Sequence, residues 1–155
     1  MESNDTLVKK LVAKYGKDRD NLLPILQGVV DKKRSLSQES IMTIAQEMEI
    51  PAAHVFGTAS FYSFLDIEPR GKYVIRVCKT ITCAMKGKNQ ILLAIENMLK
   101  IKVGETTTDK KFTLLQTNCL GWCHKAPAML INDDVYTELT PKAVVDILSE
   151  YKSKE

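Results

Sequence analysis

Four cysteines form two close pairs in this 155-residue sequence, and they are the residues best suited to chemistry. Cys78 and Cys83 are separated by four residues, Cys119 and Cys123 by three, and 35 residues lie between the pairs. Four thiolates that the fold brings together can bind either an iron–sulfur cluster or a structural zinc ion. The spacing therefore predicts a four-thiolate metal site and leaves the metal open.

Two disulfide bonds are the alternative use of four cysteines, and the start of the sequence argues against them. Residues 1–5 contain two acidic residues, and no apolar signal-peptide core precedes Lys9 and Lys10. We therefore expect a cytoplasmic protein, whose reducing surroundings keep the thiols free unless a metal holds them. Metal binding is the use of the cysteines that the sequence favours.

The composition argues against several classes of function. The 22 basic and 19 acidic residues give a net charge of +3, too small to indicate a nucleic-acid partner. No apolar run approaches the about 18 residues of a membrane span, so direct membrane insertion is not expected. The chain has neither a G-x-G-x-x-G motif nor a phosphate-binding glycine loop. We expect no nucleotide cofactor on this chain.

The N-terminal part, residues 1–68, is predicted to form a bundle of about four helices. Apolar residues recur at helical spacing in four stretches, residues 7–12, 22–30, 41–48 and 55–61. Ser37 is the expected N-cap of the third helix. Phe61, Tyr62 and Phe64 are expected at the end of the fourth helix, as part of the bundle's core rather than as an interface.

The C-terminal part, residues 69–155, is predicted to be a mixed α/β domain with the order β-α-β-β-β-α. The expected elements are strands at residues 73–77, 112–117, 128–131 and 135–139, and helices at residues 87–100 and from residue 141 onward. Thr140 is the expected N-cap of the last helix. Each cysteine pair follows the end of a strand, so a mixed sheet can place both loops at one edge. The fold class is therefore α+β.

Several short motifs accompany the cysteine pairs. They are Cys119-Leu120-Gly121-x-Cys123, Gly104-Glu105-Thr106-Thr107-x-Asp109, Ala126-Pro127, Ala59-Ser60-Phe61-Tyr62-x-Phe64 and Pro69-Arg70-Gly71-Lys72. Together with the C-x4-C pair, they resemble the thioredoxin-like [2Fe-2S] ferredoxin subunit family. This family includes the 24-kDa-type NADH dehydrogenase subunit of complex I and the related subunits of NAD-linked or electron-bifurcating hydrogenases and formate dehydrogenases. The resemblance covers residues 7–150.

The resemblance implies a cofactor and its ligands. Cys78, Cys83, Cys119 and Cys123 would hold one [2Fe-2S] cluster, in a thioredoxin-like domain that follows an N-terminal helical bundle. Trp122 is a departure, because the family usually has a small residue between the glycine and the last cysteine.

Residues beside these cysteines are candidates for tuning the site. Lys79, Lys86 and Lys125 would favour reduction if their charges lie near the cluster, although a solvated surface charge is the favoured interpretation for any single one of them. Gly121 lacks a Cβ, so its backbone can turn tightly and point N–H groups at sulfur.

The function implied is one-electron transfer without substrate chemistry on this chain. Because NADH donates a two-electron hydride, a flavin must convert it into single electrons. The resemblance places FMN and NAD(H) on a partner subunit, alongside other iron–sulfur subunits. Two alternatives remain from the residues, a stand-alone thioredoxin-like [2Fe-2S] ferredoxin and a zinc-stabilised interaction module.

Overall fold

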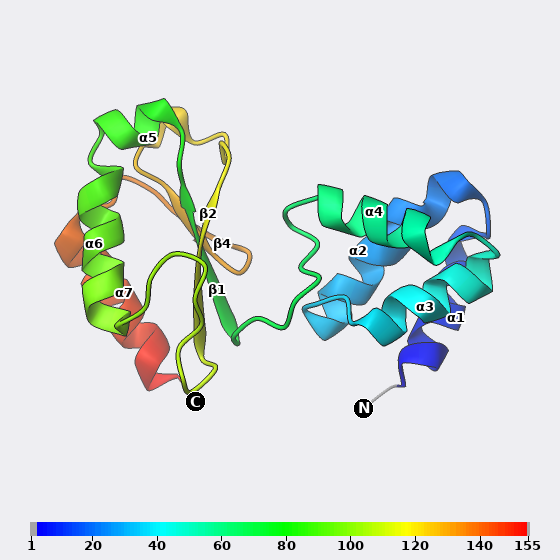
Figure 1. Ribbon diagram of the computed structural model, residues 1–155. Helices are drawn as coiled ribbons and strands as arrows, with labels where there is room; N and C mark the ends of the chain where they lie inside the picture. Colours follow the sequence, from blue (N-terminus) through cyan, green and yellow to red (C-terminus); the bar gives the residue numbers. More distant parts are fainter. Residues whose placement is uncertain (1–2, 155) are drawn as a thin grey trace. The chain divides into compact units, whose positions relative to one another are not determined.

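The computed structural model describes residues 3–154. The chain divides into two compact units, and the boundary in the sequence lies between Pro69 and Arg70 (Figure 1). The first unit contains helices, and the second contains a four-stranded sheet with three further α-helices. Each unit has a hydrophobic core of its own. The predicted α+β class is confirmed.

Four α-helices form the first unit, as the apolar periodicity predicted. Their bounds are Asn4–Tyr15 (α1), Leu22–Lys33 (α2), Gln38–Met48 (α3) and Ala52–Phe61 (α4), and a short 3₁₀ helix, Arg19–Asn21, precedes α2. Ser37 is the N-cap of α3, as predicted, because its hydroxyl accepts a hydrogen bond from the Ser40 N–H. Gly16 ends α1 with a φ of 93°, a conformation that favours glycine.

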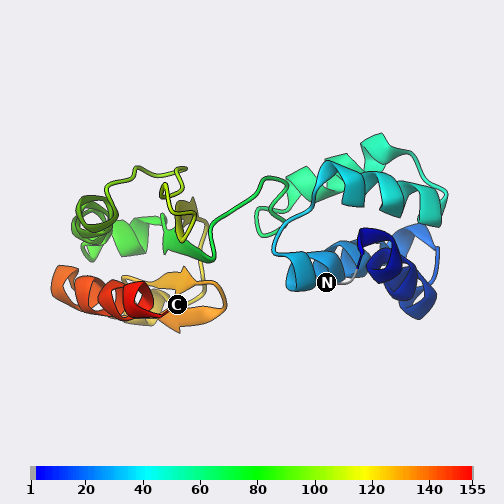
Figure 2. The ribbon, with the colours of Figure 1, turned by 90° about the horizontal axis from the view of Figure 1, so that it is seen from below.

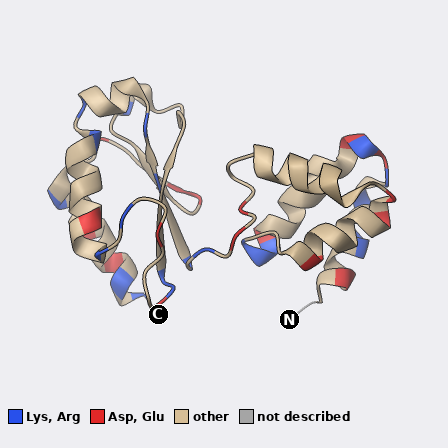
Figure 3. Cartoon of the chain, viewed as in Figure 1, with Lys and Arg blue, Asp and Glu red and all other residues tan. Residues whose placement is uncertain are grey.

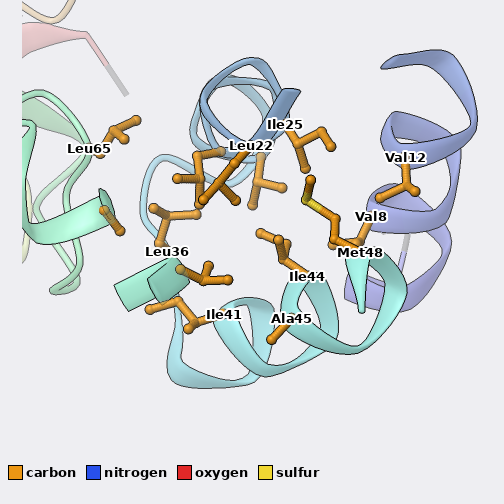
Figure 4. Close-up of a cluster of buried hydrophobic side chains, with 14 residues drawn as sticks. Val8, Val12, Leu22, Ile25, Leu36, Ile41, Ile44, Ala45, Met48 and Leu65 are labelled. Atoms are coloured by element: carbon orange, nitrogen blue, oxygen red, sulfur yellow. The ribbon is translucent and has the colours of Figure 1, made fainter. Parts of the chain in front are cut away.

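Aliphatic side chains from all four helices fill the core of this unit (Figure 4). Val8, Ile25, Ile44 and Val55, one from each helix, are completely buried. Because residues three and four apart share a helix face, α4 meets the core through Val55 and Ala59.

The aromatic residues at the end of α4 are on the surface, so the expectation that they belong to the core is wrong. Phe61 is 79% exposed, and Tyr62 and Phe64 are also exposed. Two residues along a helix correspond to a turn of roughly 200°. Phe61 therefore points away from the core that Ala59 faces, and the chain leaves the helix at Tyr62 in an extended conformation.

A mixed sheet is the centre of the second unit. Its strands are Tyr73–Cys78 (β1), Phe112–Thr117 (β2), Met129–Ile131 (β3) and Asp134–Tyr136 (β4), in the order β2-β1-β3-β4. β1 and β2 are parallel, and the other two pairings are antiparallel. The predicted order of strands and long helices is confirmed, with one short additional helix, Ile81–Met85 (α5).

Two long helices, Lys88–Leu99 (α6) and Pro141–Ser153 (α7), cover one face of this sheet (Figures 1 and 2). Thr140 caps α7 as predicted, since its hydroxyl accepts a hydrogen bond from the Ala143 N–H. Ile75 of β1 lies between Leu114 of β2 and Ile131 of β3, and all three are completely buried. The sheet is therefore held rigidly by its helix-covered face, which fixes the loops at its ends.

Gly71, from the Pro69-Arg70-Gly71-Lys72 motif, lies where a side chain cannot fit. A Cβ there would come within 2.9 Å of the Phe112 carbonyl carbon and 3.0 Å of the Lys110 carbonyl oxygen. Both neighbours are backbone, so they cannot move aside easily. We expect Gly71→Ala to lower the free energy of unfolding of the second unit by about 1–3 kcal/mol, measured by urea titration with Trp122 fluorescence.

Gly57→Ala is the matched control, because a Cβ at Gly57 would have no atom within 4 Å. Gly57 is inside α4, where alanine favours the helix by about 0.5–1 kcal/mol over glycine. This variant should leave the Trp122 transition, which reports the second unit, unchanged, and the first unit should be as stable as before or slightly more stable. An unchanged Trp122 transition in Gly71→Ala would contradict the close approach of Gly71 to the Lys110 and Phe112 backbone.

Candidate metal centre

The parallel pairing of β1 and β2 brings the two cysteine loops together at one edge of the sheet. Cys78 is the last residue of β1 and lies opposite Thr117, the last residue of β2. The Lys79 N–H donates to the Thr117 carbonyl at 2.9 Å, and Cys119 follows two residues later. The Cys78 N–H donates to the Ala128 carbonyl at 3.1 Å. The expectation that both loops share one edge is confirmed.

The first cysteine pair is buried. Cys78 and Cys83 are each 1% exposed, and helix α5 turns the chain so that Cys83 returns to the side of Cys78. Burial alone would raise the pKa of Cys78, but hydrogen bonds from Thr80, Cys83 and the Leu120 backbone hold that pKa below its usual value. Burial and the neighbouring Cys78 sulfur raise the pKa of Cys83.

The second pair is exposed. Cys119 and Cys123 have their sulfurs 3.3 Å apart. Their hydrogen bond, followed by burial and the charge of Cys119, raises the pKa of Cys123. Gly121 has a φ of 83°, and its N–H donates to the Cys119 Sγ at 3.3 Å. The predicted role of Gly121 in aiming an N–H group at sulfur is confirmed.

The four thiols are thus organised as two adjacent pairs, and all four are free. The Lys79 N–H bond to the Thr117 carbonyl holds the start of the first cysteine loop beside the start of the second, so the pairs are neighbours. Within residues 3–154, no three or more His, Cys, Asp or Glu side chains lie close enough together to hold a metal ion, so the structure brings the thiols together as pairs. A [2Fe-2S] core contains two irons and takes four cysteine thiolates. The donor set of two thiol pairs fits this group.

Apolar side chains surround the pairs on the surface. Ile81 and Met85 project from α5, and Met85 is 80% exposed. Trp122 is partly exposed, and its ring stacks on His124 with a centroid distance of 5.8 Å. Exposed apolar residues grouped around a site are typical of a surface that meets another protein.

The two segments that carry the cysteine pairs contain charges of one sign only. Residues 78–90 and 117–131 contain no Asp or Glu, whereas their Lys79, Lys86 and Lys125 are exposed (Figure 3). The cysteine loops therefore expose positive charges together with the apolar residues.

Sequence reasoning missed one contact of this centre. Thr80 has its hydroxyl 3.2 Å from the Cys78 Sγ. The available signal was the position of Thr80 two residues after a cysteine and directly before a helical segment.

The chain belongs to the thioredoxin-like [2Fe-2S] ferredoxin family, whose sequence model matches residues 8–152. It is 44% identical over 125 residues to the NADH-quinone oxidoreductase E subunit of Buchnera aphidicola, covering 80% of this chain and 77% of that protein. It is 37% identical over 150 residues to the corresponding protein of Aquifex aeolicus, covering 97% and 94%. The family that the motifs indicated is confirmed.

A solved NAD+-reducing [NiFe]-hydrogenase in the air-oxidised state has a similar fold, with a TM-score of 0.76 at 22% sequence identity. The similarity covers 86% of this chain but only 23% of that hydrogenase chain. At this identity the likeness shows the fold alone.

Family membership decides between the two metals that the spacing left open. The cofactor is a [2Fe-2S] cluster, as predicted, and not a structural zinc ion. Among residues 3–154, no helix has both the length and the apolar character needed to cross a membrane.

Lys79 lies inside the first cysteine loop, so its charge should influence the cluster. Lys79→Glu replaces a positive charge by a negative one, which repels the electron added on reduction. We expect the reduction potential to fall by about 20–80 mV, because each charge unit contributes on the order of 1 kcal/mol at such a distance. Protein-film voltammetry measures the shift, which should shrink at high salt.

Lys72→Glu makes the same charge change at the opposite end of β1, about 20 Å from Cys78 along the strand. That distance exceeds the screening length of about 10 Å at moderate salt, so its potential should stay near the original. Equal shifts in the two variants would show that Lys79 has no special influence on the site.

Proposed function

We propose that this chain is the electron-transfer subunit of a multi-subunit NAD(H)-dependent oxidoreductase. In this proposal Cys78, Cys83, Cys119 and Cys123 are the ligands of its single [2Fe-2S] cluster. The observation that carries the proposal is the meeting of two thiol pairs at one edge of the sheet in a chain of this family. The relatives from Buchnera and Aquifex, which are subunits of NADH-quinone oxidoreductases, support the same role.

The chain's residues fit electron transfer rather than substrate chemistry. When bound, a [2Fe-2S] cluster accepts and returns one electron at a time. Cys78 and Cys83, which are buried, and Cys119 and Cys123, which are exposed, would hold the cluster and leave it accessible from the surface to an electron donor. NADH releases two electrons together as a hydride, so a flavin on another subunit must accept that hydride and pass the electrons on singly.

The partner is therefore an FMN- and NAD(H)-binding subunit, accompanied by other iron–sulfur subunits, and we place the assembly in the cytoplasm. The surface around the cysteine loops supports a protein partner of defined chemistry. Its exposed apolar residues Ile81, Met85 and Trp122 would suit an apolar patch on the partner, and the exposed lysines of the two cysteine loops would suit acidic groups beside that patch.

We further propose that residues 1–68 and 69–155 are separate domains with separate tasks. The second carries the cluster, and the first docks onto the partner subunit. The separate hydrophobic cores of the two units support this division.

Anaerobic purification of the tagged chain from its native source tests the proposal. The chain should be red-brown, contain two irons and two sulfides per molecule, and give an electron paramagnetic resonance signal after one-electron reduction. It should also bring down a flavin-containing subunit. A colourless protein with bound zinc would refute the cluster, and a red-brown chain that purifies alone would favour a stand-alone ferredoxin.

A further inference from the structure

Thr80 differs from the other hydroxyl residues that begin helices in this protein. Within residues 3–154, four helices have a Ser or Thr at the N-cap: Ser3, Ser37, Thr80 and Thr140. In three of them the hydroxyl accepts a hydrogen bond from a backbone N–H of the first turn. Thr80 makes no such capping bond. Its hydroxyl is used elsewhere.

That hydroxyl is directed at the buried cysteine pair. The Thr80 Oγ1 lies 3.2 Å from the Cys78 Sγ. A metal-bound thiolate carries no proton and can only accept, so the Thr80 hydroxyl must be the donor once the cluster is present.

We propose that Thr80 sets the reduction potential of the cluster through the hydrogen bond from its hydroxyl to the Cys78 Sγ. The proposal rests on the cluster assignment made above. Reduction adds one electron, supplied by the partner's flavin, and part of the added negative charge falls on the thiolate sulfurs. A donor at sulfur therefore stabilises the reduced form more than the oxidised form.

The burial of Cys78 strengthens this effect. At 1% exposure, water cannot replace a missing donor at this sulfur, and the low local dielectric leaves the hydrogen bond unscreened. The exposed Cys119 has both solvent and the Gly121 N–H as donors. A single side-chain hydroxyl should consequently matter more on the buried side.

Thr80→Val tests the proposal, because valine keeps the shape and removes the hydroxyl. Spectroelectrochemical titration should show a more negative potential. At the midpoint of the original protein, the ratio of reduced to oxidised cluster should fall about five- to tenfold. Thr80→Ser restores the hydroxyl and should return the ratio to its original value.

Thr140→Val is the matched control, because it removes the hydroxyl of a threonine N-cap that does cap its helix. It should lower the thermal stability and leave the potential unchanged. Thr80→Val should lower the potential and leave the thermal stability near that of the original protein.

Three results would overturn the proposal. The first is an unchanged potential in Thr80→Val, and the second is an altered potential that Thr80→Ser does not restore. The third is loss of the cluster from both Thr80→Val and Thr80→Ala, which would mean that the hydroxyl serves assembly instead of potential. Absence of a cluster in the unaltered chain would instead refute the proposed function, so the two failures are distinguishable.

Discussion

Alanine in place of Cys78, Cys83, Cys119 or Cys123 should leave the protein without its [2Fe-2S] cluster. A [2Fe-2S] cluster takes four cysteine thiolates, and the chain contains no cysteine beyond these four. Loss of one ligand opens an iron to water and to hydrolysis. Iron and sulfide content and visible absorbance should fall to near zero in each single variant purified without oxygen.

Serine variants should separate the buried pair from the exposed pair. A serine oxygen must be deprotonated to bind iron, and desolvation disfavours that charge. Ser at position 119 or 123, on the exposed side, should therefore keep a weakened cluster more readily than Ser at position 78 or 83.

Thr82→Ala is the control for these variants, because Thr82 lies in the same loop and only its backbone takes part in the loop's hydrogen bonds. It should keep full iron and sulfide. A cysteine whose alanine variant did the same would not be a ligand.

The arrangement of the cysteine loops was predictable because it follows from local patterns. The apolar patterns predicted the strands before Cys78 and Cys119, and a helix between two strands is the usual connection of a parallel pair. Parallel strands end at the same edge, so the meeting of the loops follows from the order of the elements.

The difference between the two cysteine pairs was not predictable, because it depends on tertiary packing. Helix α5 has only five residues and no apolar period, so nothing in the sequence showed that Cys83 is turned into the interior. The contact between Thr80 and Cys78 depends on that turn. Its geometry is therefore visible only in the folded chain.

The aromatic residues at the end of α4 show a related limit. Phe61 and Phe64 read as core residues because large aromatics are usually buried. Which face of α4 meets the core is decided by Val55 and Ala59, and that choice leaves both aromatics outside. Because these aromatic side chains are exposed, they are the residues of the first unit that we expect to contact another protein.

Phe61→Ser should weaken binding of the flavin-bearing partner subunit by about 30-fold or more, without changing the cluster. Phe61, Tyr62 and Phe64 are exposed aromatics next to one another in sequence, and the rings of Phe61 and Tyr62 pack edge to face at 5.1 Å. Aromatic residues that fill a partner's pocket carry about 2 kcal/mol or more each at protein interfaces. Surface plasmon resonance with the anaerobically purified partner measures the change.

Met42→Ser is the matched control for this prediction. Met42 is an exposed apolar residue of the same unit, but it lies on α3, away in sequence from the aromatic group. Its replacement should change the affinity less than threefold, since most interface positions and most surface positions contribute little. Visible absorbance and reduction potential should be the same in both variants, because the cysteines belong to the other unit.

A fragment of residues 70–155 extends the same argument to the whole N-terminal domain. It retains the complete core of the second unit and all four cysteines, so it should still assemble a cluster. Without the aromatic group it should fail to co-purify with the partner. If the fragment bound the partner as tightly as the full chain, the apolar surface at Ile81, Met85 and Trp122 would be sufficient for docking. The aromatic group of the first unit would then have to serve some other contact.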